Sequence, residues 1–189
     1  MKLVLASASP RRRELIKSLN LEVEVIPSGA DENIEPCAPE LYVKKLATLK
    51  AKDVFQKTSS LTLGADTVVE VDGTILGKPK TCEQAEQMFR LLCGRSHRVL
   101  TGVCLIDGSH EVADCEITTV TFKPFDAEVI DEYIKTGSPF DKAGGYGIQD
   151  EILAPIVANV DGELDNVIGL PVKLIAKILK EKFGLWTSR

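Results

Sequence analysis

The stretch from residue 3 to residue 16 constrains the fold of this chain most. Residues 3–6 form a short apolar run typical of a buried strand. Ser9 and Pro10 follow, a favoured N-cap and a favoured first helical residue, and helical apolar spacing then begins at Leu15. We therefore expect a strand that turns directly into a helix.

The first turn of that helix holds three consecutive arginines: Arg11, Arg12 and Arg13. Free backbone N–H groups and the helix dipole favour anions there, so each cation costs about 0.3–1 kcal/mol. A basic first turn therefore predicts an external anion, and phosphate is the best candidate. The alternative is a solvated basic turn.

Composition narrows the class of protein. The 189 residues are 44% hydrophobic and 27% charged with a net charge of −5, which predicts an ordinary globular protein with no general basic surface for a nucleic acid polymer. Apolar runs fall short of a membrane span, and the first residues lack a signal-peptide pattern. We expect one domain, residues 1–189, in the cytoplasm, with five reduced cysteines and no membrane partner.

Strand and helix patterns alternate along the chain, and two hairpin signals, Asp72-Gly73 and Asp107-Gly108, interrupt them. The mixture predicts an α/β protein with a mixed central sheet flanked by helices. Strands are expected at residues 21–27, 61–71, 74–76, 98–106, 111–122 and 155–160, and helices at 40–55, 83–93, 126–135 and 172–182.

Asp66 lies inside the apolar strand 61–71. Desolvating a carboxylate costs several kcal/mol unless it has a partner or a metal, so Asp66 is expected to hold a divalent ion or to orient a water. Asp31 and Glu32, in a polar loop, could complete an oxygen site for Mg²⁺ or Mn²⁺. The alternatives are a turn aspartate that caps a helix and two solvated loop acids.

Several lysines are candidates for phosphate binding. Lys78 and Lys80 flank a proline in a loop after the predicted hairpin, where the alternative is an exposed basic turn. Lys50 and Lys52 lie two positions apart on one predicted helix and cannot share a face. We therefore expect one of them to reach the site and the other to lie on the surface.

The segment 141–149 is rich in glycine, so its backbone can approach a ligand closely, and Gln149 offers a donor and an acceptor to a base edge. It matches neither the Walker A motif nor the dinucleotide fingerprint. With only two histidines in the chain, a zinc site is not expected, and His97 is interpreted as a structural residue.

Six segments together resemble the Maf family of nucleotide pyrophosphatases, in the family's order and over essentially the whole chain. They are SASPRR at 7–12, GADTVV at 64–69, GKP at 77–79, GRSH at 94–97, DKAGGYGIQ at 141–149 and GLP at 169–171. The resemblance implies an α/β fold with two lobes around a cleft, similar to inosine triphosphate pyrophosphatases. It also implies hydrolysis of a nucleoside triphosphate to its monophosphate and pyrophosphate, with Mg²⁺, Mn²⁺ or Co²⁺ as cofactor.

The resemblance further implies roles for individual residues. Asp66 matches the family's proton acceptor, and Glu32 matches a carboxylate that helps Asp66 hold the metal. The implied phosphate contacts are Ser7, Arg11, Arg12, Lys50 and Lys78. Arg11, Thr67 and Gln149 are similar to the branch that acts on dTTP and UTP, and family members tend to form homodimers.

At two places the sequence departs from the family pattern, so the resemblance does not predict the rim of the base pocket or the preference among pyrimidines. Asp150 and Glu151 stand where small glycines are common, and an aromatic residue is replaced around residues 164–166. One alternative function is house-cleaning of modified pyrimidine nucleotides such as 5-methyl-UTP, pseudo-UTP or 5-methyl-CTP. Another is a non-catalytic, nucleotide-binding regulator of cell division. The presence of both Asp66 and Glu32 favours an enzyme, because a pure binder gains little from a buried acid.

Overall fold

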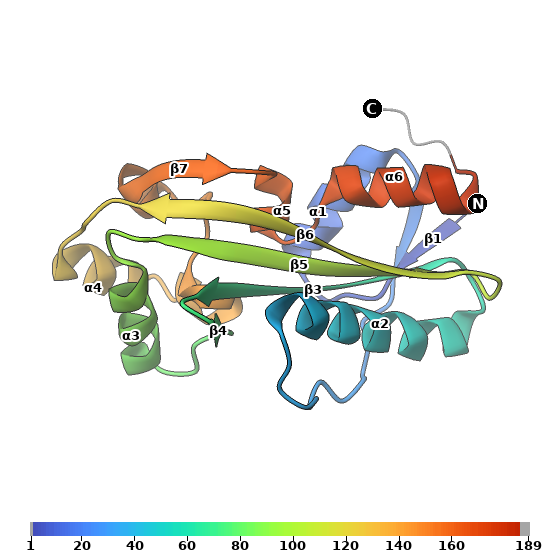
Figure 1. Ribbon diagram of the computed structural model, residues 1–189, viewed down its shortest axis with the longest axis horizontal. Coiled ribbons are helices and arrows are strands. Elements are labelled where there is room, and N and C mark those ends of the chain that lie inside the picture. Colours follow the sequence, from blue (N-terminus) through green and yellow to red (C-terminus); the bar gives the residue numbers. More distant parts are fainter. Residues whose placement is uncertain (1, 186–189) are drawn as a thin grey trace. The chain divides into compact units, whose positions relative to one another are not determined.

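The computed structural model describes residues 2–185 (Figure 1), so Met1 and residues 186–189 of the expected domain lie outside the described residues. Strands are β1 (Lys2–Leu5), β2 (Glu22–Val25), β3 (Thr62–Val71), β4 (Thr74–Leu76), β5 (Ser96–Ile106), β6 (Glu111–Phe122) and β7 (Val157–Asp161). Helices are α1 (Pro10–Leu15), α2 (Pro39–Thr58), α3 (Cys82–Leu92), α4 (Ala127–Lys135), α5 (Leu164–Ile168) and α6 (Val172–Phe183). Short 3₁₀ helices are η1 (Ile16–Leu19), η2 (Ser138–Asp141), η3 (Ala143–Gly145) and η4 (Glu151–Ile156).

The strands pair in the order β2-β1-β3-β5-β6-β7, and β4 pairs with β3. β1 is parallel to both β2 and β3, with Leu5 opposite Val25 and Leu63, whereas β4 and β7 pair antiparallel to their neighbours. Asp72 (φ 49°) and Gly73 (φ 79°) form the turn between β3 and β4, and both positive φ values suit a hairpin turn. The expected mixed sheet and this hairpin are therefore confirmed.

The chain forms two compact units. Unit 1 comprises the described parts of Met1–Thr67, Thr101–Glu116 and Gly169–Arg189, and unit 2 comprises Val68–Leu100 and Ile117–Ile168. Strands β3, β5 and β6 contribute residues to both units. The single domain and the cleft between lobes stay predictions.

In unit 1 helices cover both faces of the sheet. Successive side chains of a strand point to opposite faces, so they pack in two different hydrophobic clusters. Leu3 and Leu5 of β1 pack in the cluster that includes α6, while Val4 packs with Val54 of α2. Figure 1 shows α2 along one face of these strands and α6 along the other. Glycine makes the α2 contact possible, since a Cβ on Gly64 would lie 2.1 Å from the backbone oxygen of Ala47.

In unit 2, aromatic residues from α3, α4 and the glycine-rich segment fill the core. Phe89 and Tyr133 meet edge to face with ring centroids 5.6 Å apart, and Phe122 and Tyr146 do so at 4.9 Å. Gly144 (φ 66°) of η3 packs against β3, because a Cβ added to it would come within 2.8 Å of the Val69 side chain. The glycine-rich segment therefore packs in this core.

Three details differ from the sequence-based expectations. The strand expected at 155–160 begins at Val157, because Pro155 and Ile156 belong to η4 and proline has no N–H for the ladder. The segment 141–149, expected as a loop, contains 3₁₀ turns. Helix α5 was not expected, because five residues are too few to show periodicity. None of the helices within residues 2–185 is both long and apolar enough to cross a membrane.

Candidate active site

The expected strand-to-helix turn is confirmed. Ser9 is the N-cap of α1, and its hydroxyl accepts a hydrogen bond from the Arg12 backbone N–H at 3.4 Å. The buried Ser7 hydroxyl accepts from the backbone N–H of Ser9 at 3.2 Å. Arg11 is half-buried, whereas Arg13 is exposed as the solvated-turn interpretation expects.

The Arg12 side chain donates hydrogen bonds from all three guanidinium nitrogens. Nε donates to Gly169 O (2.8 Å), Nη1 to Ala65 O (2.9 Å), and Nη2 to Thr67 Oγ1 (2.9 Å). Burial lowers the pKa of Arg12, and the negative charge of Asp66 opposes that shift. Arg12 thus ties α1 to β3 and to the segment before α6. Its role as a phosphate contact stays a prediction, since a phosphate would have to compete with these acceptors.

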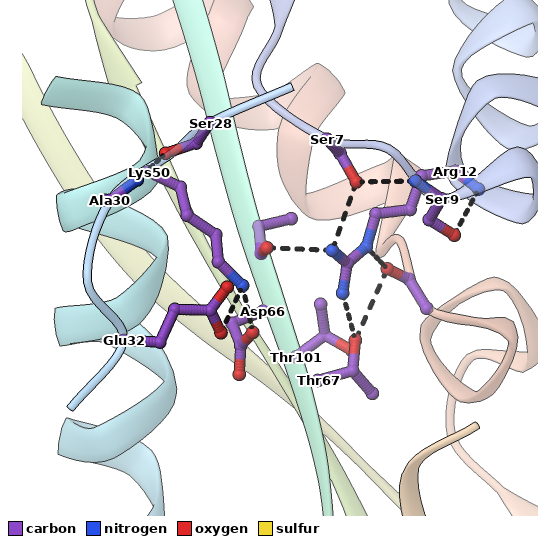
Figure 2. Close-up of polar contacts among 12 residues, drawn as sticks. Ser7, Ser9, Arg12, Ser28, Ala30, Glu32, Lys50, Asp66, Thr67 and Thr101 are labelled. Carbon is purple, nitrogen blue, oxygen red and sulfur yellow. Dashed lines mark hydrogen bonds and ion pairs between the residues drawn. The ribbon is translucent and has the colours of Figure 1, made fainter. Parts of the chain in front are cut away.

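Asp66 and Thr67 are neighbours on β3, so their side chains lie on opposite faces of the strand (Figure 2). Thr67 lies on the Arg12 side, where its hydroxyl also bonds the buried Thr101 hydroxyl at 2.9 Å. Asp66 lies on the α2 side. Apart from Arg11, the residues of unit 1 predicted for the site therefore form two separate clusters around one strand.

The cluster on the α2 side joins Lys50, Asp66 and Glu32. Lys50 Nζ lies 2.6 Å from Asp66 Oδ1 and 3.1 Å from Glu32 Oε2. The Lys50 and Asp66 side chains are only 12% and 13% exposed, while Glu32 is 56% exposed. Within the described part of the chain, Lys50 is the single hydrogen-bond partner of the Asp66 side chain. Asp66 is thus a buried carboxylate with acceptor capacity left over.

The acidic pair fits a divalent cation that is shared with phosphate oxygens. Its two carboxylates converge on one positive group, the Lys50 ammonium, and Mg²⁺ commonly takes one or two carboxylates plus substrate phosphates. No third histidine, cysteine or acidic residue joins them in a metal-binding group within residues 2–185. Asp31, which might have been the third acid, accepts a hydrogen bond from the backbone N–H of Asn33 (3.0 Å).

Tyr42 belongs to the surroundings of this pair, although the sequence suggested only an apolar contact. The pKa of its phenol is raised, first by burial and then by the negative charges of Asp66 and Glu32. One sequence feature could have indicated this contact. Tyr42 precedes Lys50 by eight residues, a spacing that puts both side chains on the same broad side of α2. Lys52 lies elsewhere, in an exposed ion pair with Glu111 at 2.9 Å, which confirms that only one of the two lysines reaches Asp66.

Lys78 and Gln149 belong to unit 2, where both are exposed. The turn that carries Lys78 contacts the glycine-rich segment, since the Gly144 N–H donates to Gly77 O at 2.9 Å. The Gly77-Lys78-Pro79 turn and the glycine-rich segment, which are far apart in the sequence, therefore lie together. Their roles toward phosphate and base stay predictions.

His97 is buried in unit 2, as expected for a structural residue. Its Nε2 lies 2.7 Å from the Tyr146 hydroxyl, and burial lowers its pKa to about 4. The ring is therefore neutral near pH 7. Ser96, its neighbour, points elsewhere and bonds the Thr121 hydroxyl at 2.8 Å, so the two residues form no catalytic pair.

Comparisons with known proteins identify the family and agree with the fold. The family model described as Maf-like protein matches residues 2–182. A dTTP/UTP pyrophosphatase of Thermococcus onnurineus is 43% identical over 97% of this chain and 99% of its own length, and one of Thermococcus gammatolerans is 45% identical over 93% and 94%. The Ham1 protein of Staphylococcus aureus shares the fold, with a TM-score of 0.53 at 14% identity over 83% of this chain and 80% of that one. The chain belongs to the Maf-like protein family.

Proposed function

We propose that the protein is a nucleoside triphosphate pyrophosphatase that hydrolyses dTTP and UTP to the monophosphate and pyrophosphate. The observation that carries the proposal is the buried Asp66 carboxylate. Among the described residues it has one hydrogen-bond partner, Lys50, which also contacts Glu32. The names of full-length relatives at 43–45% identity support the choice of substrates.

In this proposal Asp66 accepts the proton of the water that attacks the α-phosphorus. Lys50 contacts Asp66 through Oδ1, so Oδ2 has no protein hydrogen-bond partner within the described residues and can accept from that water. No covalent intermediate is needed, because pyrophosphate leaves as a stabilised anion. Positioned charges then supply most of the rate enhancement.

Glu32 and Asp66 would hold the divalent cation, Mg²⁺, Mn²⁺ or Co²⁺, which when bound neutralises negative charge on the triphosphate. The Lys50 ammonium, which lies at both carboxylates, would contact a phosphate of the substrate. The further phosphate contacts proposed are Ser7, Arg11, Arg12 and Lys78, and Arg11, Thr67 and Gln149 are proposed to select the pyrimidine base. The biological setting proposed is nucleotide-pool sanitation and cell-division arrest by a cytoplasmic homodimer.

The test is turnover of a nucleotide panel with Mg²⁺, Mn²⁺ and Co²⁺, with pyrophosphate measured separately from orthophosphate. The panel contains dTTP, UTP, the purine triphosphates and the modified nucleotides 5-methyl-UTP, pseudo-UTP and 5-methyl-CTP. We expect pyrophosphate from dTTP and UTP. Release of orthophosphate alone would overturn the reaction, and tight UTP binding without turnover would favour the non-catalytic regulator.

Asp66→Asn tests the proton acceptor directly. The amide keeps the size of the side chain but cannot take the proton, so kcat should fall by about 10²–10⁴-fold. The thermal unfolding midpoint, measured in parallel, should show that the variant is folded. Wild-type turnover in Asp66→Asn would refute the role.

A further inference from the structure

Glu32 is carried by a long irregular segment. Residues 26–38, between β2 and α2, contain no helix or strand, and the Glu32 side chain is 56% exposed. Its carboxylate nevertheless lies 3.1 Å from Lys50 Nζ. An exposed side chain on an irregular loop keeps one place only if the loop is anchored nearby, because ordering each residue costs about 1–2 kcal/mol of conformational entropy.

Asp53 on α2 provides such an anchor. Its Oδ2 accepts hydrogen bonds from the Ser28 hydroxyl and the Gly29 backbone N–H, both at 2.8 Å. The Ser28 hydroxyl in turn accepts from the Ala30 N–H at 3.1 Å. Lys57 Nζ lies 2.7 Å from the other oxygen, Oδ1. The Asp53 carboxylate therefore fixes Ser28 and Gly29 directly and Ala30 through the Ser28 hydroxyl, two to four positions before Glu32.

The charge of Asp53 is secure at physiological pH. The hydrogen bonds from Lys57, Gly29 and Ser28 lower its pKa to about 2, with Lys57 the largest cause. Hydrogen bonds to an ionised carboxylate are shorter and roughly twice as strong as neutral ones. The anchor is therefore stronger than an ordinary side-chain contact to a loop.

Helix α2 links the anchor to the acidic pair. Asp53 follows Lys50 by three residues, so both side chains project from the same face of α2. The helix lies directly against β3 at Gly64, two residues before Asp66. Figure 2 shows Ser28, Ala30 and Glu32 on one loop beside α2, with Lys50 reaching from the helix between Glu32 and Asp66.

We propose that Asp53 is a positioning residue that holds the Glu32 loop against α2, and so sets the Glu32 carboxylate opposite Asp66 for cation binding. The inference rests on the proposed function for what the acidic pair binds. The Asp53 carboxylate bonds Ser28, Gly29 and Lys57, and none of these is Lys50, Asp66 or Glu32. Its removal therefore changes the placement of the site and not its chemical groups.

The test uses Mn²⁺ binding to the nucleotide-free protein, followed by electron paramagnetic resonance, together with amide hydrogen exchange. In Asp53→Ala the dissociation constant for Mn²⁺ should rise about tenfold, as loss of an outer-shell partner typically produces. Exchange at Gly29 and Ala30 should quicken. Asp53→Asn, which keeps an acceptor oxygen without the charge, should fall between Asp53→Ala and wild type.

Lys52→Ala is the matched control, because it removes an exposed ion pair from the same helix. It should change neither Mn²⁺ affinity nor exchange in the loop. Wild-type Mn²⁺ affinity in Asp53→Ala would overturn the positioning role.

Glu32→Gln separates that outcome from a failure of the proposed function. We expect it to weaken Mn²⁺ binding as Asp53→Ala does. Unchanged Mn²⁺ affinity in Glu32→Gln overturns the metal role of the pair, and with it the purpose assigned to Asp53. Weakened binding in Glu32→Gln beside wild-type binding in Asp53→Ala overturns the role of Asp53 alone.

Discussion

Among the described residues, each of the two units contains a lysine whose side chain is largely buried near two carboxylates, and the two side chains are similar in exposure. The Lys50 side chain of unit 1 is 12% exposed and lies within 3.1 Å of Asp66 and Glu32. The Lys142 side chain of unit 2 is 11% exposed and lies 2.8 Å from Asp141 and 3.7 Å from Asp150. Burial and charge alone do not tell which cluster is functional.

Hydrogen bonding separates them. Lys142 Nζ donates to the Ser138 carbonyl (2.8 Å), the Ser138 hydroxyl (2.7 Å) and Asp141 (2.8 Å), which uses all its hydrogens. Asp150 accepts from the hydroxyls of Ser138 and Tyr133, and the Tyr133 hydroxyl accepts from the Gly147 N–H. The Lys142 ammonium is saturated by protein acceptors, and in this sense we call its network closed. The network also holds Asp150, the residue that follows Gln149.

The Lys50 cluster is open by the same measure. The ammonium contacts only two carboxylates within the described residues, and Asp66 has no other hydrogen-bond partner there. A closed network stabilises a fold, whereas buried groups with capacity to spare can bind a ligand without first losing protein partners. The comparison therefore assigns Lys142 to stability and Lys50 to function.

Among the variants that compare the two clusters, Lys50→Met should produce the largest effect. Loss of one positioned cation should lower the rate of pyrophosphate release by about 10²–10³-fold. Steady-state kinetics at saturating metal measures the loss, and Lys52→Met, on the exposed side of α2, is the control that should retain wild-type kcat. Equal losses in both variants would contradict the assignment.

The pH dependence of the free energy of unfolding tests whether the buried His97 of unit 2 affects stability. Its pKa is about 4 in the folded protein against an ordinary 6.5, so between these values the unfolded chain binds a proton that the native protein does not. Stability is full above pH 6.5 and should fall by about 3 kcal/mol as the pH drops from 6.5 to 4. Urea unfolding of wild type and His97→Gln across this range measures the contribution, which should be missing in the variant. Parallel pH profiles in both proteins would rule it out.

The features that could be predicted from the sequence are those that depend on neighbouring residues in the chain. The Ser9-Pro10 helix start, the Asp72-Gly73 hairpin and the split between Lys50 and Lys52 each depend on residues close together in the chain, and each is confirmed. The family resemblance over the whole chain is likewise confirmed.

What the sequence did not predict depends on packing between distant residues. Arg12 bonds Gly169, 157 positions away, and Asp53 was not singled out because its loop partners lie 24 and 25 positions earlier. From the sequence, Asp150 is only a departure from the family pattern. In the structure it accepts hydrogen bonds from Tyr133 and Ser138, which explains an acidic residue at this position. No periodicity or spacing rule connects such pairs.

Lys142→Met should show the smallest and most specific effect, a loss of stability. Removing one partner of a buried ion pair costs about 3–5 kcal/mol, but Asp141 and Asp150 are 58% and 30% exposed and can regain water. We therefore expect the free energy of unfolding to fall by roughly 2 kcal/mol, measured by urea unfolding, with Lys80→Met as an exposed control in the same unit.

Mn²⁺ distinguishes the two lysine clusters in the same assay. Lys50→Met leaves two converging carboxylates that a divalent cation can neutralise, so Mn²⁺ should restore part of any stability lost in that variant. Of the two carboxylates near Lys142, Asp150 already accepts hydrogen bonds from Tyr133 and Ser138, so Mn²⁺ should restore nothing in Lys142→Met. Recovery in both variants, or in Lys142→Met alone, would show that closure of the hydrogen-bond network does not decide which cluster binds a cation.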